Sequence, residues 1–129
     1  MKSIDLMVGD WYANSDGDIC KVEKILGNIV WGQGDDVSDS TDDPNPITLT
    51  AEILENNGFV LRGKTYILKW RGADIHWRKT DGYASITAPN NLKLEGWCSI
   101  SNGYFCYVHI LQHALRLCGL DDLADNFKV

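Results

Sequence analysis

Two histidines give the clearest chemical signal in this sequence. His109 and His113 are four residues apart, and on a helix this spacing lets two imidazoles reach one metal ion. However, Ile110 stands where metalloprotease chemistry requires a glutamate directly after the first histidine. Arg116 also adds a permanent positive charge to the same stripe. The metal-site hypothesis therefore competes with a polar helix face that meets solvent or a neighbouring sheet.

The segment 62–79 suggests a second chemistry. Its basic residues are Arg62, Lys64, Lys69, Arg71, Arg78 and Lys79. They are interleaved with Tyr66, Trp70, His76 and Trp77, and the segment contains a single acid, Asp74. Basic and aromatic side chains together on strands are typical of surfaces that bind single-stranded nucleic acid. The two-residue period of the segment predicts instead that most of these rings point into the core.

A third candidate site is an acidic stretch between residues 33 and 46. Its aspartates are Asp35, Asp36, Asp39, Asp42 and Asp43. Calcium binding is disfavoured because the glycine and the distal glutamate of an EF-hand loop are missing. A solvated, mobile surface loop is the simple interpretation. The functional interpretation is a loop that docks on a basic partner surface, as a phosphate-mimicking inhibitor of a nucleic-acid enzyme would.

The sequence contains no familiar catalytic signature. It has no nucleophile elbow, phosphate-binding loop or dinucleotide fingerprint, and no cysteine has a local histidine partner. We therefore favour a non-catalytic protein without a cofactor, and keep a metal-dependent enzyme that uses His109 and His113 as an alternative.

Two helices are predicted to position these groups. Apolar residues recur at three- and four-residue steps over 108–118, and Gly119 provides a common helix terminator. A shorter helix is predicted over 51–57, with Thr50 as its N-cap. One more helical turn is predicted within 120–129.

Short strands separated by turn signals fill most of the remaining sequence. They are predicted at 11–12, 19–25, 28–31, 59–61, 66–70, 75–78, 83–87, 93–100 and 104–107. Strands joined so tightly must be antiparallel. A three-residue turn at 101–103 would place Cys98 opposite Cys106, whereas a two-residue turn would not. We predict an α+β fold in which the helix near 108–118 packs on an antiparallel sheet.

The length and composition fit one globular domain, 1–129. We divide it into an N-terminal β-meander (1–32), the acidic loop (33–46) and an α+β body (47–129). The net charge of −6 is unevenly distributed: residues 1–58 have a balance of −9, and residues 59–129 one of +3. Neither a signal peptide nor a membrane-spanning run is recognisable, so a cytoplasmic protein without membrane contact is expected.

Two motifs of the sequence resemble segments of other proteins. Residues 46–59 (PITLTAEILENNGF) and 107–112 (YVHILQ) resemble segments of small bacterial proteins of unknown function that are often encoded near prophages or mobile elements. The resemblance implies a bacterial, cytoplasmic setting and transfers no catalytic residue. We therefore expect an accessory protein that acts through protein contacts, with nucleic-acid binding through 62–79 as the alternative.

Overall fold

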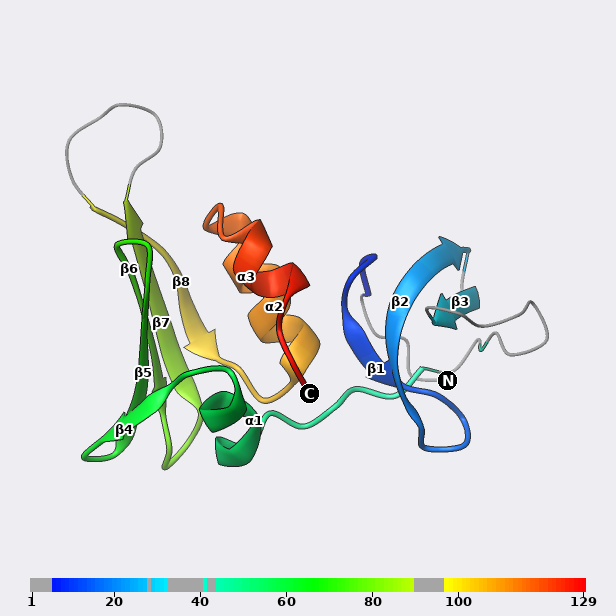
Figure 1. The fold of residues 1–129 in the computed structure, drawn as a ribbon, viewed down its shortest axis with the longest axis horizontal. Coiled ribbons are helices and arrows are strands. Elements are labelled where there is room, and N and C mark those ends of the chain that lie inside the picture. Colours follow the sequence, from blue (N-terminus) through cyan, green and yellow to red (C-terminus); the bar gives the residue numbers. More distant parts are fainter. Residues whose placement is uncertain (1–5, 28, 33–40, 42–43, 90–96) are drawn as a thin grey trace.

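The computed structural model contains two antiparallel sheets with helices between them (Figure 1). It describes residues 6–27, 29–32, 41, 44–89 and 97–129. The predicted α+β fold is confirmed. Figure 1 shows helix α2 (Val108–Leu117) lying between the two sheets, so one of its sides meets each of them.

The first sheet has the strand order β1 (Trp11–Ala13), β2 (Ile19–Leu26) and β3 (Ile29–Gly32). The turn between β1 and β2 is held by Asn14, whose side-chain oxygen accepts hydrogen bonds from two backbone amides of the turn at 3.0 and 2.9 Å. A small separate core of Tyr12, Val22 and Val30 lies beneath this sheet. The three N-terminal strands thus form a sheet of their own, a point that the sequence leaves open.

The second sheet follows the chain from β4 to β8. Its strands are β4 (Val60–Arg62), β5 (Thr65–Trp70), β6 (Ala73–Arg78), β7 (Tyr83–Pro89) and β8 (Trp97–Tyr104). Arg71 and Gly72, with φ of 47° and 86°, form the two-residue turn between β5 and β6. Two successive positive φ values match the twist of antiparallel strands.

The turn predicted at 101–103 is wrong. Strand β8 runs through these residues, and the backbones of Asn102 and Gly103 pair with Ser85 and Ala84 of β7. A long pairing with β7 therefore overrides the local turn signal. Cys98 lies within β8 and Cys106 beyond its end, so they do not face each other across a hairpin. Free cysteines among the described residues are Cys20, Cys106 and Cys118.

Helices cover the inner face of the second sheet. They are α1 (Ala51–Asn56), α2 and α3 (Asp121–Asp125). Thr50 caps α1 as predicted, because its hydroxyl accepts a hydrogen bond from the Ile53 amide at 3.3 Å. The apolar side of α2 packs on the sheet and places Val108, Leu111 and Leu115 in the main core. None of the described helices has the length and apolar character needed to cross a membrane.

Candidate nucleic-acid interface

The outer face of the second sheet is the side that points away from α2 and α3. Among the described residues, no helix or strand covers this face (Figure 1). Side chains on a strand alternate between the two faces, so every second residue of β4 to β8 points outward. The uncovered face is therefore defined by the strand register.

One row of outward side chains crosses all five strands. Arg62 is paired with Thr65, Thr65 with Arg78, and Tyr83 with Tyr104. Extending the β6–β7 register by one residue brings Arg78 beside Tyr83. We call these five residues the crossing row. Neighbouring strands are about 4.8 Å apart, so the row extends over roughly 19 Å.

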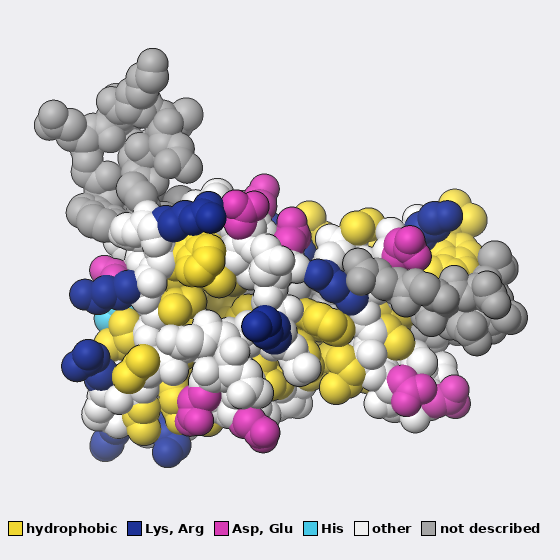
Figure 2. All heavy atoms as spheres, viewed as in Figure 1, with side chains coloured by type: hydrophobic (Ala, Val, Ile, Leu, Met, Phe, Trp, Pro, Cys, Tyr) yellow, Lys and Arg dark blue, Asp and Glu magenta, His cyan; other side chains and the backbone are white. Residues whose placement is uncertain are grey.

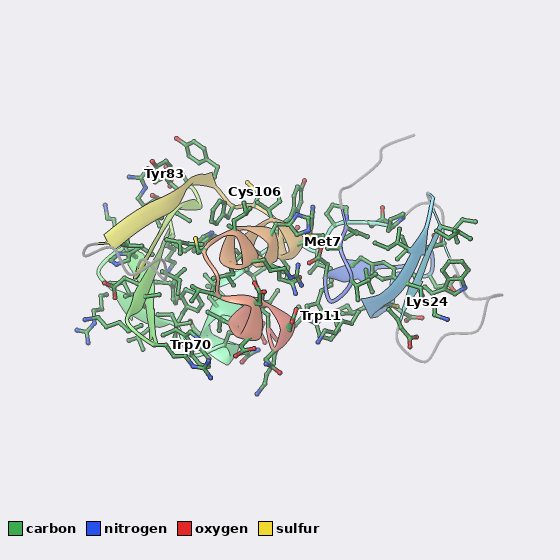
Figure 3. The ribbon with its side chains drawn as sticks, turned by 90° about the horizontal axis from the view of Figure 1, so that it is seen from above. Met7, Trp11, Lys24, Trp70, Tyr83 and Cys106 are labelled. Atoms are coloured by element: carbon green, nitrogen blue, oxygen red, sulfur yellow. The ribbon has the colours of Figure 1, made fainter. Side chains whose placement is uncertain are left out.

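The aromatic end of the crossing row is formed by two exposed tyrosines. The rings of Tyr83 and Tyr104 meet edge to face, with centroids 5.2 Å apart and planes at 75°. Tyr83 is 37% exposed and Tyr104 is 61% exposed. Figure 3 places Tyr83 at the end of the molecule remote from the first sheet. Large aromatic surfaces of this kind are available for stacking with a flat ligand.

Arg78 links the two tyrosines to the basic part of the row. Its guanidinium carbon is 5.2 Å from the centre of the Tyr83 ring. The same guanidinium makes two hydrogen bonds, of 2.8 and 2.6 Å, to the carboxylate of Asp81. These bonds, with one from the Tyr83 amide, lower the pKa of Asp81 to about 2. Arg78 is therefore fixed in place, but its charge is partly neutralised.

Most of the predicted basic residues gather around the crossing row. Those on the outer face or in the turns at its end are Arg62, Lys64, Lys69, Arg78 and Lys79, all exposed. A 2.7 Å hydrogen bond from the Lys79 amide to the Lys64 carbonyl holds the turns that carry these lysines together. In the view of Figure 2, Lys and Arg side chains are frequent along the outer side of this sheet.

Arg71 lies elsewhere. Its guanidinium stacks 5.2 Å from the Trp70 ring and forms a 3.0 Å ion pair with Asp122 of α3. This residue therefore belongs to the inner side of the fold, where it joins the β5–β6 turn to a helix. It is separated from the other five predicted basic residues.

The aromatic rings of 62–79 point inward, as the two-residue period predicts. Tyr66 and Trp77 are buried, with hydrogen bonds to Glu55 (2.8 Å) and to the Phe105 carbonyl (3.0 Å). The exposed rings come from β7 and β8 instead. Sequence reasoning missed the pairing of Tyr104 with Tyr83, because the turn wrongly placed at 101–103 pairs the strand at 104–107 with 93–100 instead of with β7.

The two histidines lie on the opposite side of α2, towards the first sheet. Nε2 of His113 contacts the carboxylate of Asp10, whose other oxygen contacts the Arg116 guanidinium. His109 is buried, stacks on Tyr107 at 5.9 Å, and meets the His113 ring edge-on at 5.7 Å. Within the described part of the chain, no three His, Cys, Asp or Glu side chains are grouped to hold a metal ion. Among the described residues, His109 and His113 thus have no third ligand grouped with them, and the metal site stays a prediction.

Gln112 completes the polar stripe of α2 and is fully buried. Its amide nitrogen donates to the carbonyls of Gly9 and Ala124, each at 3.0 Å, and its oxygen accepts from the Trp11 amide at 3.0 Å. Trp11 belongs to β1, and its indole nitrogen donates a 2.6 Å hydrogen bond to the carbonyl of Phe127, which follows α3 (Figure 3). The polar stripe is thus a sheet-contacting face that joins α2, α3 and β1.

The described residues next to the acidic stretch contact the first sheet. Asp35, Asp36, Asp39, Asp42 and Asp43 lie outside the described residues. Thr41 pairs with Val30, and Asn45 pairs with Ala13, through backbone hydrogen bonds of 2.8 to 2.9 Å. Both anchors belong to the first sheet, on the other side of α2 from the outer face (Figure 1).

Comparison with known proteins gives no further guide to this surface. No protein-family model, curated protein or solved structure matches the chain. Function must therefore be argued from the geometry of the crossing row and its surrounding charges.

Proposed function

We propose that the protein binds single-stranded nucleic acid on the outer face of its second sheet. The proposal is based on the crossing row, because this row brings two exposed tyrosine rings and two guanidinium groups together on one uncovered surface. Bases stack on aromatic rings whatever their sequence, while basic side chains neutralise the phosphates.

The charge distribution supports an anionic ligand. The whole chain has a net charge of −6, yet five of its twelve basic residues lie on or beside this one face. Two acids, Asp74 and Asp81, offset them in part. A concentration of positive charge on an acidic protein attracts phosphate locally, although the rest of the molecule repels it.

Each residue of the surface has a distinct role. Tyr83 and Tyr104 supply the stacking platform, and Arg78 orients Tyr83 from the side. Arg62, together with the neighbouring lysines of the turns, contacts phosphates. The expected binding is sequence-tolerant and strongly dependent on salt, as is usual for such surfaces.

Fluorescence anisotropy with a labelled 12-nucleotide strand tests this proposal. We expect the double variant Arg62→Ala/Lys64→Ala to weaken binding and to reduce its salt dependence. Lys24→Ala, which removes an exposed lysine from the first sheet, is the matched control and should bind as the wild type does. Absence of binding by the wild type at low salt would refute the proposal.

The alternative of protein contacts through the acidic loop stays a prediction, as do the bacterial setting and the cytoplasmic location. Changing the five loop aspartates to asparagine tests the loop directly. If the variant recovers every partner that the wild type recovers in a pull-down, the loop has no role in binding.

A further inference from the structure

A cavity of about 220 Å³ opens at the edge of the second sheet. Its lining residues are Gly58, Val60, Arg62, Ile67, Leu68 and Lys69. Sites for drug-sized ligands usually have roughly 300 to 1,000 Å³. This cavity is therefore suited to one small ring system rather than to a whole cofactor.

Gly58 lines the cavity and has no side chain. This glycine follows α1 with a φ of 90°, a conformation that other residues rarely adopt. Extending the β4–β5 register places it opposite Lys69. A Cβ atom built on Gly58 would lie 3.6 Å from Cδ1 of Leu68, another residue of the cavity lining.

The lining has two chemical parts. Val60, Ile67 and Leu68 supply apolar walls, whereas Arg62 and Lys69 supply two positive charges. A complementary ligand has a flat apolar body and a negative charge next to it. Arg62 is also the last residue of the crossing row, so the cavity continues the surface on which Tyr83 and Tyr104 lie.

We infer that this cavity is a subsite for a terminal base of the bound strand, with the adjacent phosphate between Arg62 and Lys69. The inference rests on the proposed function and adds an end-specific contact to it. The two cations and the continuity with the crossing row favour a nucleotide over a peptide strand added to the open edge of β4.

Three oligonucleotides of equal length test the subsite: one intact, one lacking its 5′-terminal base and one lacking its 3′-terminal base. Loss of a stacked base weakens binding by roughly tenfold in comparable surfaces. We expect the wild type to show this loss for one of the two abasic strands. The affected strand also identifies which end of the nucleic acid lies at β4.

Val60→Phe fills the cavity with a residue that strands accept well. Val60 is 56% exposed, so the fold is expected to tolerate the change. The variant should bind the intact and the abasic strands equally, at the affinity of the wild type for the abasic strand. Leu61→Phe, on the other face of β4, is the control and should keep the preference for the intact strand.

The possible results distinguish a failure of the subsite from a failure of the proposed function. Failure of the wild type to bind any oligonucleotide overturns both the subsite and the proposed function. Equal binding of all three strands by the wild type overturns the subsite alone. Equal loss of preference in both phenylalanine variants assigns the effect to the strand edge and also overturns the subsite. Should Val60→Phe not fold, Lys69→Ala provides the second test: it removes a positive charge from the cavity lining and must reduce the preference for the intact strand over the affected abasic strand.

Discussion

Polar and charged side chains are buried on one side of this molecule and exposed on the other. Between α2 and the first sheet, Asp10 and Gln112 are completely buried, and each of them is held by several polar partners. On the outer face of the second sheet, Tyr104 is 61% exposed and the neighbouring basic side chains are in solvent. The buried groups hold the fold through their hydrogen bonds and ion pairs, whereas the exposed groups are the ones that we propose to bind a ligand.

This difference separates effects on stability from effects on binding. A buried charge that loses its partner carries the cost of its desolvation, whereas an exposed one returns to water. Changes at the interface of α2 and the first sheet should therefore lower the free energy of unfolding. Changes on the outer face should alter affinity and leave the free energy of unfolding nearly unchanged.

The largest expected effect is that of Asp10→Ala. It leaves His113 and Arg116 at the interface without their shared carboxylate, and removing one member of a buried charged group typically costs about 3 to 5 kcal/mol. Urea denaturation measures the loss. Asp125→Ala is the matched control, since its 3.3 Å pair with Arg116 is more exposed. Equal small losses in both variants would contradict a structural role for the Asp10 carboxylate.

Gln112→Met should have the next largest effect. The replacement keeps the length of the side chain but removes the hydrogen bonds of Gln112 to the Gly9 carbonyl and the Trp11 amide. It also removes one bond to the Ala124 carbonyl, which still accepts from the Phe127 amide at 3.3 Å. Leaving buried polar groups unsatisfied costs roughly 2 to 3 kcal/mol in total at such a site. Thermal unfolding gives the size of the loss, and faster amide exchange at Trp11 would locate it. Unchanged exchange there would show that Gln112 does not join α2 to β1.

A smaller effect, confined to binding, is expected for Tyr104→Ala. Removing a stacking ring typically costs about 1 to 3 kcal/mol of binding free energy per base. Because the ring is largely exposed, the free energy of unfolding should change by no more than about 0.5 kcal/mol. Anisotropy titrations and denaturation curves measure the two quantities. Leu117→Ala, which removes a 74% exposed side chain from α2, should change neither.

The sequence predicts the elements of both regions better than their contacts. The amphipathic pattern over 108–118 locates α2, and strand alternation correctly sends Tyr66 and Trp77 inward. These signals are local, since they depend on residues close together in the chain. They also predict which side of α2 is polar, but not what that side meets.

Contacts between distant segments escape such reasoning. Asp10 and His113 are 103 residues apart, and no local pattern links them. The position of Tyr104 beside Tyr83 depends on the register of β7 and β8. An asparagine and a glycine inside β8 imitate a turn, so the local signal gives the wrong answer where long-range pairing decides the structure.

The smallest expected effect is that of Asp81→Asn, which removes an ion pair from the outer face. The asparagine can still accept the hydrogen bond from the Tyr83 amide, but it no longer neutralises Arg78. Affinity for a single strand should therefore rise a few-fold at low salt, with a steeper salt dependence. Weaker binding would show that the ion pair is needed to orient Arg78 beside the Tyr83 ring.

The same variant gives a pH dependence with a defined sign. The pKa of Asp81 is lowered in the folded protein to about 2 from an ordinary value of 3.8, so the folded state favours the ionised carboxylate. Its contribution to stability is complete above the ordinary pKa and is lost as the pH falls through the lowered one. Because the pair is exposed, the wild type should be only slightly more stable than Asp81→Asn at pH 6. That difference should shrink between about pH 4 and pH 2, and a difference that grows on acidification would contradict the assignment of the Arg78–Asp81 pair.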